Sequence, residues 1–364
     1  MVTDEPRGPW PDVAIPPGEL LAETLEAMGL SQADLASRCG RPAQVINNII
    51  KGKKVITPQT ALEFERVLGT PAYVWVNLER DYQFNKARLK DLDRLKTQTK
   101  QVGEFPYAEM VRLGWVAEAG DKLQRVKELL AFFGVASLDK IPSVPDAAYR
   151  RSGGRRPSPS ALAAWRRKAQ IEAQAIDAGK FNKDGIEALI PRLRQLTREE
   201  VGGAFCEAKD VLRTNGVALV CVPHLRKTYL RGATWWFGAG RSLDRAVVAL
   251  TARYRYHDIF WFSLFHEIGH LLRHRKRQVF IDFTDEEEDE QEREADRFAA
   301  DSLIPPSDFQ RLKALRPYRD HAIRAFAEQL GIGAGIVVGR LQHEKLIRHG
   351  GLNHLRRKLT LQAE

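Results

Sequence analysis

The residues best suited to chemistry stand close together in the sequence. His266, Glu267 and His270 form the pattern His-Glu-x-x-His inside a strongly apolar segment. On a helix, positions four apart share a face, so both imidazoles can reach one metal ion. Glu267 is then placed to act as general base on a water at that ion. The alternative is a chance match in a buried helix whose histidines bond to the backbone.

An open catalytic zinc site needs a third protein ligand. A third histidine in the extended pattern would require glycine at 273 and histidine at 276. The sequence has Arg273 and Lys276 there, so that class of site is excluded. A glutamate on a second helix is the remaining source, and a helix is expected from about residue 290 to 303. Two histidines and one glutamate form a known zinc ligand set, so we expect Zn²⁺.

The second helix offers several carboxylates. Glu292 shares one stripe with the alanines three and seven positions later, and small residues allow close helix approach. We therefore expect Glu292 to be the third ligand, with Glu294 as the second choice. Asp296, one turn after Glu292, is placed to orient a metal ligand by a hydrogen bond without binding the metal itself. The alternative is that these carboxylates belong to the solvated acidic stretch of residues 284–294.

Neighbouring segments carry four further expectations. His274 is expected to cap the C-terminus of the first helix, where a positive charge is favoured. His257 is expected to lie at the surface. The acidic run of residues 284–294 is interpreted as a solvated loop, with a flap over the cleft as the alternative. An edge strand, at 231–238 or 245–253, is expected to pair with an extended peptide.

The N-terminal part has the pattern of a helix-turn-helix. Five short helices are expected between residues 16 and 90, and Gly40 lies in the turn between the second and third. Ser31 is expected to cap the second helix, with Asp34 where a glutamate would complete a capping box. Glutamine and asparagine can pair with adenine in the major groove, and lysine can contact phosphate. The candidate DNA-contacting residues are Gln44, Asn47, Asn48, Lys51, Lys53 and Lys54. A plain helical bundle with a solvated polar face is the alternative.

These elements predict a multidomain fold class. It combines an all-α helix-turn-helix domain, a helical connector, and an α+β zincin-like metallopeptidase domain with a small sheet and the His-Glu-x-x-His helix. Three short strands are expected, near 216–222, 231–238 and 245–253. The expected segments are a disordered leader (1–15), a helix-turn-helix domain (16–90), a helical connector (91–210), a metallopeptidase domain (211–310) and a basic helical C-terminal region (311–364).

Composition supports the same interpretation. A chain of 364 residues, 43% of them hydrophobic, is long enough for two or three domains. The net charge of +10 suits contact with nucleic-acid phosphates. No run of 18 apolar residues and no apolar N-terminal segment is present, so we expect neither a membrane span nor a secretory signal. The 3 cysteines are too few for a disulfide framework, which fits a cytoplasmic protein.

Residues 16–82 resemble the Xre/Cro-type helix-turn-helix of the HigA antitoxin family. The resemblance is carried by PPGELL (16–21), GLSQADLA (29–36), KGKKVITPQTAL (51–62) and LGTPAYVWVNLERDY (68–82). Domains of this kind dimerise on palindromes. The resemblance therefore implies a homodimer that binds a palindromic double-stranded DNA operator.

Residues from about 215 to 310 resemble the ImmA/IrrE family of zinc metallo-endopeptidases. The segments that carry this are GVALVCVP (216–223), RGATWW (231–236), DIFWFSLFHEIGHLLRH (258–274) and EREADRFAADSLIP (292–305). The resemblance implies zinc on His266, His270 and Glu292, and Glu267 as general base. Asp296 stands where much of the family has asparagine.

Two functions follow from these patterns. The first is a DNA-binding regulator whose zinc endopeptidase domain cleaves a protein partner, by resemblance a repressor or antitoxin-like regulator, in stress or mobile-element control. The second is a HigA-like transcriptional repressor or antitoxin whose metal domain is a non-catalytic sensor. The complete set of His266, Glu267, His270 and Glu292 favours the first.

Overall fold

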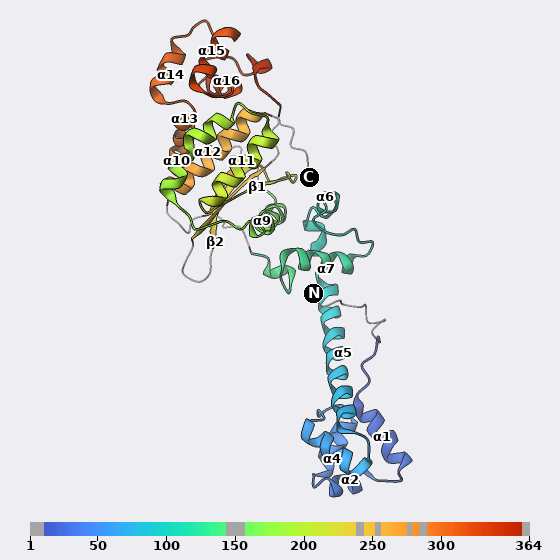
Figure 1. The fold of residues 1–364 in the computed structure, drawn as a ribbon. Coiled ribbons are helices and arrows are strands. Elements are labelled where there is room, and N and C mark those ends of the chain that lie inside the picture. The colour runs from blue at the N-terminus through green and yellow to red at the C-terminus, as the bar shows by residue number, and fades with distance from the viewer. Residues whose placement is uncertain are drawn as a thin grey trace. The chain divides into compact units, whose positions relative to one another are not determined.

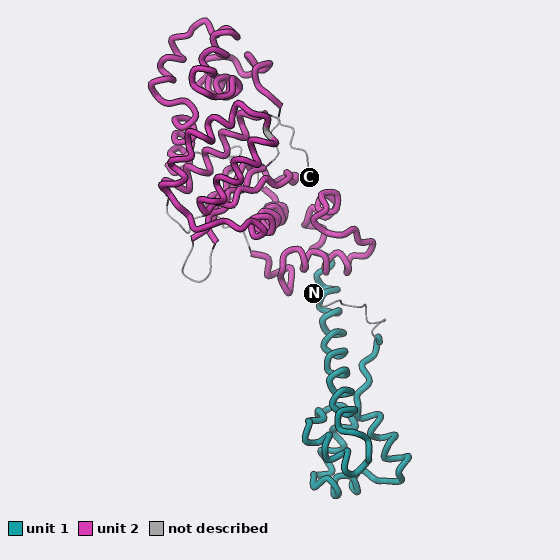
Figure 2. Tube along the Cα trace, viewed as in Figure 1, with its two compact units in different colours: residues 1–100 teal, residues 101–364 magenta. Residues whose placement is uncertain are grey.

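The protein divides into two compact units, residues 1–100 and residues 101–364 (Figure 2). The computed structural model describes residues 11–142, 157–237, 244–251, 256–274, 279–283 and 290–358. Most of the expected leader and the acidic residues 284–289 therefore lie outside the described residues. The expected domain boundaries remain predictions, because a boundary concerns which segments fold independently.

The first unit is a helical bundle. Its helices are α1 (Pro17–Ala27), α2 (Gln32–Arg38), α3 (Ala43–Ile50), α4 (Pro58–Leu68) and α5 (Ala72–Gln98) (Figure 1). Their apolar faces meet in one core that includes the fully buried Leu21, Ile46 and Trp75. The sequence analysis began the helical connector at residue 91, whereas α5 is one helix of 27 residues that runs from Ala72 to Gln98.

Local signals in the sequence set where these helices begin. The Ser31 hydroxyl accepts a hydrogen bond from the backbone N–H of Asp34, and the Asp34 carboxylate accepts one from the backbone N–H of Ser31. The aspartate thus completes the capping box that we expected to need a glutamate, because its shorter side chain still reaches the cap. Thr57 caps α4 in the same way, with Pro58 at the first helical position.

The second unit places a small sheet among many helices (Figure 1). Its α-helices are α6 (Tyr107–Arg112), α7 (Lys122–Phe133), α9 (Pro159–Gln174), α10 (Lys183–Leu196), α11 (Val201–Thr214), α12 (His257–Arg273), α13 (Glu290–Leu303), α14 (Pro306–Lys313), α15 (Asp320–Leu330) and α16 (Ala334–His343). Short 3₁₀ turns lie at Gln101–Glu104, Leu138–Lys140 and Asn353–Leu355. The strands are β1 (Val217–Val222), β2 (Leu230–Phe237), β3 (Arg245–Thr251) and β4 (Phe280–Phe283).

The sheet has the order β1-β3-β2-β4. Strands β1 and β3 are parallel, whereas β2 is antiparallel to both β3 and β4. Each of β2 and β3 is therefore paired on both sides, and the expectation that one of them is an edge strand was wrong. The sequence analysis missed β4, a four-residue strand that covers the free side of β2.

Helix α12 lies at the centre of the second unit. Trp261, Phe265 and Ile268 on this helix are fully buried. It packs against β2 and β3 of the sheet, against α13 and against α16. The close approach of α12 and α13 depends on small residues, because a Cβ at Gly269 would lie 3.2 Å from Cα of Ala295. The multidomain architecture, with an all-α domain and an α+β region, agrees with the sequence prediction.

Within the described residues, no single helix is long and apolar enough to cross a membrane; the helix pair Asp320–Leu330 and Ala334–His343 passes that test together but is bent by 111°.

Candidate metal centre and DNA-binding helix

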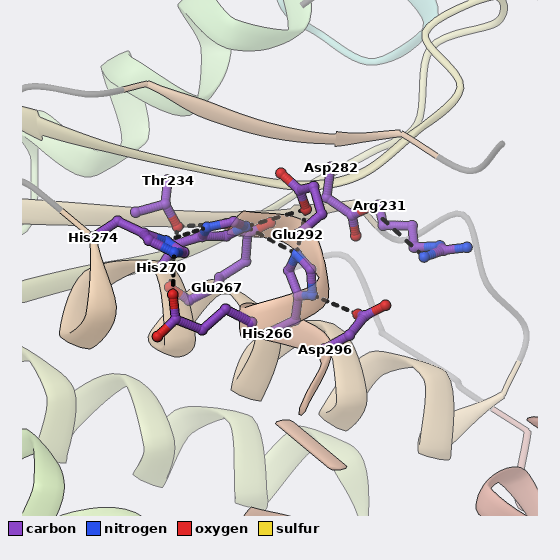
Figure 3. A network of polar contacts seen from close by, with 10 residues as sticks. Arg231, Thr234, His266, Glu267, His270, His274, Asp282, Glu292 and Asp296 are labelled. Carbon is purple, nitrogen blue, oxygen red and sulfur yellow. Dashed lines mark hydrogen bonds and ion pairs between the residues drawn. The ribbon is translucent and has the colours of Figure 1, made fainter. Parts of the chain in front are cut away.

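Three potential metal ligands converge between α12 and α13 (Figure 3). The Nε2 atoms of His266 and His270 lie 2.9 Å apart. Oε2 of Glu292 lies 3.1 Å from Nε2 of His266 and 3.3 Å from Nε2 of His270. All three side chains are buried. The structure therefore brings together the three residues that the sequence analysis selected.

The spacing of these atoms suits a tetrahedral metal ion. Bonds of about 2.0–2.1 Å to such an ion place neighbouring ligand atoms about 3.3 Å apart. The distances of 2.9, 3.1 and 3.3 Å in the cluster are close to that value. The donor set of two imidazoles and one carboxylate is also one that transition metals of this size prefer.

Each imidazole of the cluster has a polar partner at Nδ1, a carboxylate for His266 and a second histidine for His270. Nδ1 of His266 lies 2.8 Å from Oδ1 of Asp296, and Nδ1 of His270 lies 3.0 Å from Nδ1 of His274. With a proton on each Nδ1, both Nε2 lone pairs point at the Glu292 carboxylate. Three acceptors that face one another without a shared proton repel, so a cation between them is the arrangement that satisfies all three.

His274 and Glu294 are linked to each other, and His274 also contacts the cluster directly through His270. Nε2 of His274 lies 3.3 Å from Oε2 of Glu294. Glu294, the second choice for the third ligand, thus contacts His274 while Glu292 contacts the two cluster histidines. His274 stands at the C-terminal cap of α12, as its position in the sequence indicated, and its ring also reaches Nδ1 of His270.

Glu267 faces the sheet, with its carboxyl group enclosed by β2. Oε2 accepts a short hydrogen bond from the hydroxyl of Thr234. A Cβ at Gly232 would lie 2.3 Å from Oε1, so only glycine leaves room for the carboxyl group there. Oε1 is buried and has no hydrogen-bond partner among the described residues. A water or a substrate N–H at this atom would satisfy it.

Burial and neighbouring charges set the protonation of the cluster. Complete burial raises the pKa of Glu267 to about 8. Burial also disfavours the ionised form of Glu292, but its interactions with the neighbouring His266 and His270 outweigh the effect of burial and hold its pKa well below the usual value. Glu292 is therefore the charged member of the cluster, as a metal ligand must be.

Sequence reasoning missed Asp282 on β4. The residue is 4% exposed and its side chain lies beside the cluster, with Oδ1 3.6 Å from Nη1 of Arg231 (Figure 3). Burial raises the pKa of Asp282, and the negative charges of Glu292 and Asp296 raise it further. No spacing rule connects this residue to the histidines. Only the pairing of β4 with β2, opposite Gly232, places it there.

His257 contradicts its expected surface position. The residue is 4% exposed, and Nε2 accepts a hydrogen bond of 3.0 Å from the indole N–H of Trp261. Burial lowers the pKa of His257 to about 4. Helix α12 begins at His257 itself, and His257 and Asp258 in its first turn are buried.

In the first unit, α3 presents the polar residues chosen for DNA contact. Gln44 is exposed, and Asn47 and Asn48 are half-buried on the same helix. Nε2 of Gln44 donates to Oδ1 of Asn48, and Nδ2 of Asn47 donates to Oε1 of Gln32 on α2. Lys51, Lys53 and Lys54 follow the helix and are exposed. The structure thus keeps all six candidates on α3 or the turn after it.

Comparison with known families assigns both regions. The sequence model of the IrrE N-terminal-like domain, a peptidase family, matches residues 231–342, and a helix-turn-helix model matches residues 21–75. The chain joins a helix-turn-helix domain to an IrrE-like peptidase domain. The IrrE-like match spans β2 to α16 and includes the whole candidate metal centre. The helix-turn-helix match contains α2, the turn and α3, so a DNA-binding regulatory domain is present.

Individual relatives cover the helix-turn-helix domain. The virulence-associated protein I of Dichelobacter nodosus is 39% identical over 75 residues, which is 20% of this chain and 69% of that protein. An addiction module antidote protein of the HigA family from Coxiella burnetii is 32% identical, with a TM-score of 0.20, over 25% of this chain and 91% of its own. The Pseudomonas aeruginosa antitoxin HigA, solved with the higBA promoter, is 28% identical, with a TM-score of 0.22, over 24% and 95%.

Proposed function

We propose that the IrrE-like domain is a zinc-dependent endopeptidase that cleaves a protein partner of repressor or antitoxin-like type. The observation that carries this is the convergence of His266, His270 and Glu292 beside the buried carboxyl group of Glu267. A purely structural metal site is closed by a fourth protein ligand, whereas three ligands leave one position for water and substrate. The DNA-binding domain then makes the whole protein a regulator of transcription.

A zinc ion held by His266, His270 and Glu292 would supply the Lewis acidity that polarises the scissile carbonyl and activates water. Its positive charge would also lower the pKa of Glu267, so that this carboxylate accepts a proton from water and delivers it to the leaving amine. Thr234 holds Oε2 of Glu267, which leaves Oε1 free to face the reacting groups. Asp296 and His274 hold the two imidazole rings through contacts at their Nδ1 atoms.

Strand β4 offers the place for the substrate backbone. It lies at the end of the described sheet, next to β2, and carries Asp282 beside the cluster. An extended peptide can add to such an edge through backbone hydrogen bonds. This strand replaces the two central strands that the sequence analysis favoured for the role.

The test is a pair of substitutions on the zinc-loaded protein. Glu267→Gln keeps the size of the side chain and removes the base, so we expect bound zinc to remain near one ion per chain and cleavage to fall by at least about a hundredfold. Glu290→Gln, at an exposed position at the start of α13, is the matched control. Cleavage is measured on a proteome-derived peptide library by mass spectrometry. Equal cleavage by Glu267→Gln and wild type would show that the mechanism is wrong.

For the N-terminal domain we propose that a homodimer binds a palindromic operator through α3. The supporting observation is the helix-turn-helix match, together with the exposed Gln44 and the lysines after α3. Because such a domain acts on the chromosome, the proposal places the protein in the cytoplasm. Zinc binding without any proteolysis would instead favour a repressor or antitoxin whose metal domain is a sensor.

A further inference from the structure

A cavity of about 850 Å³ lies in the second unit between α12, α13 and α16. It meets the candidate metal centre only through Asp296, which lines the cavity and contacts Nδ1 of His266. Glu292 contacts the other ring nitrogen, Nε2, so a ligand in the cavity would be separated from the metal position by the ring of His266. The volume is in the range of pockets that bind small organic molecules. The cavity is therefore a second candidate binding site, distinct from the metal centre.

The wall of the cavity contains four arginines and three carboxylates, and each carboxylate has a partner. Asp258 accepts two hydrogen bonds from Arg356, at 3.0 and 2.7 Å. Glu344 lies 2.9 Å from Arg340. The third carboxylate is that of Asp296, which contacts the metal centre as described above. The negative charges of the wall are thus already matched by groups of the protein.

The arginines of the wall are not all matched in the same way. Arg297 on α13 is exposed, and it has no hydrogen bond or ion pair with any described residue. Nε of Arg340 is buried and lacks an acceptor in the part of the chain that the structure describes. A guanidinium can donate hydrogen bonds but cannot accept them. The wall therefore has an excess of positive charge and of donors, which favours an anionic ligand.

A hydroxyl group in the same wall also lacks a partner. Ser263 on α12 is 4% exposed, and its hydroxyl makes no hydrogen bond to another described residue. A buried polar group without a partner costs free energy, which a hydrogen bond to a ligand would offset. His343 and His349, both exposed, add further nitrogen atoms to the wall. The cavity thus combines a charged donor with neutral polar groups.

The remaining accessible part of the wall is apolar. Ile259 and Phe262 on α12 are half-buried and line the cavity. The ring centroid of Phe262 lies 6.5 Å from that of His343. Contact with these groups would remove apolar surface from water and so stabilise the organic part of a ligand. The wall therefore suits a molecule with an anionic group on an organic body.

We propose that this cavity binds a small phosphorylated organic molecule, with its phosphate at Arg297 and Ser263 and its organic part against Ile259 and Phe262. A phosphate group carries up to about two negative charges and three strong acceptor oxygens, so it can use several donors at once. The proposal does not depend on peptidase activity, because none of these four residues is a candidate metal ligand or the candidate general base.

The probes are three phosphate esters, namely adenosine 5′-monophosphate, uridine 5′-monophosphate and glucose 6-phosphate. Each is compared with its unphosphorylated parent, and inorganic phosphate and citrate are measured beside them. Calorimetry on the full-length protein at about 0.15 M salt gives the affinities. We expect at least one ester to bind about tenfold or more tightly than both its parent and inorganic phosphate.

Two variants locate the binding in the cavity. Arg297→Gln removes the unmatched charge, and we expect it to weaken binding of that ester by about tenfold or more. Ser263→Ala removes the buried hydroxyl, and we expect a loss of about threefold or more. Affinity for the unphosphorylated parent should stay the same in both. Arg324→Gln, at an exposed position on α15 outside the cavity wall, is the matched control and should bind the ester like wild type.

Three results would overturn the proposal. The first is that no ester binds more tightly than its parent at millimolar concentration. The second is an ester affinity that is the same in Arg297→Gln and in wild type. The third is tighter binding of citrate than of every ester, because the site would then be one for carboxylates. Arg297 is exposed, so its variant remains decisive if circular dichroism shows that Ser263→Ala is misfolded. None of these results bears on the peptidase proposal.

Discussion

His274 lies directly behind His270, with 3.0 Å between their Nδ1 atoms and with Nε2 of His274 3.3 Å from Oε2 of Glu294. The donors and acceptors in this series of hydrogen bonds are set by the chemistry of the groups. Glu294 accepts the proton of His274 Nε2, so Nδ1 of His274 is free to accept the proton of His270 Nδ1. His270 is thereby held in the tautomer whose Nε2 lone pair faces Glu292. A residue expected only to cap the helix thus also orients a candidate ligand.

We predict that His274→Ala weakens zinc binding by about tenfold, because loss of an orienting partner costs that much in other metal sites. A competition titration with a chromogenic chelator measures the dissociation constant. His321→Ala, at an exposed position on α15, serves as control and should bind zinc like wild type. An unchanged affinity in His274→Ala would mean that the ring of His270 is held by packing alone.

Gly232→Ala should uncouple metal binding from catalysis. The new methyl group would lie 2.3 Å from Oε1 of Glu267, and the buried carboxyl group must then move away from its position. We expect zinc content to be unchanged and the cleavage rate to fall by about tenfold or more. Gly103→Ala, which has no atom within 4 Å of its new Cβ, is the matched control. Full activity in Gly232→Ala would show that the position of Glu267 is not critical.

The buried His257 predicts a loss of stability in mild acid. Its pKa is about 4 in the folded protein and near 6.5 when unfolded, so the unfolded chain binds the extra proton between these values. Stability conferred by the neutral ring is complete above pH 6.5 and falls as the pH drops toward 4. The cost between pH 7 and pH 5 is about 2 kcal/mol.

The variant His257→Gln should therefore lose less stability than wild type over the same pH interval. Urea unfolding of the metal-free protein at both pH values gives the difference. His321→Gln, with an exposed ring, should follow wild type. Parallel pH dependence in wild type and His257→Gln would contradict the assignment.

Residues of α3 and the turn after it should affect DNA binding in two different ways. Gln44→Ala should reduce the binding free energy by about 1–3 kcal/mol on a duplex selected from random sequences. It should also relax the sequence preference at one base pair. Lys53→Gln should weaken binding to selected and random duplexes equally. It should also lower the slope of log affinity against log salt concentration by about one. Lys122→Gln in α7 is the control for net charge. Titrations at several salt concentrations by fluorescence anisotropy measure both effects.

Local signals in the sequence were sufficient for much of the fold. Ser31 predicted a helix start that the structure has, and α13 covers the expected residues 290–303. The stripe that Glu292 shares with Ala295 and Ala299 also singled it out among the carboxylates of α13. Each of these depends on neighbours within one or two helical turns, where chain geometry leaves few choices.

Features that depend on distant segments could not be read in the same way. Asp282 reaches the cluster only because β4 pairs with β2, and a four-residue strand has too little pattern to be recognised. Because β4 was missed, the sequence analysis also took β2 for a possible edge strand. His257 was misplaced because the depth of its burial comes from packing around the start of α12.

The ligands of the candidate centre come from two helices, α12 and α13, that are separated along the chain by β4 and its flanking segments. A bound ion would therefore act as a cross-link, because it closes the loop of chain that runs from His270 to Glu292. Departure of the ion and local opening of α13 would then be a single linked event. Hydrogen exchange after chelation should quicken first in the amides of Glu290–Leu303, while the core of the sheet remains protected.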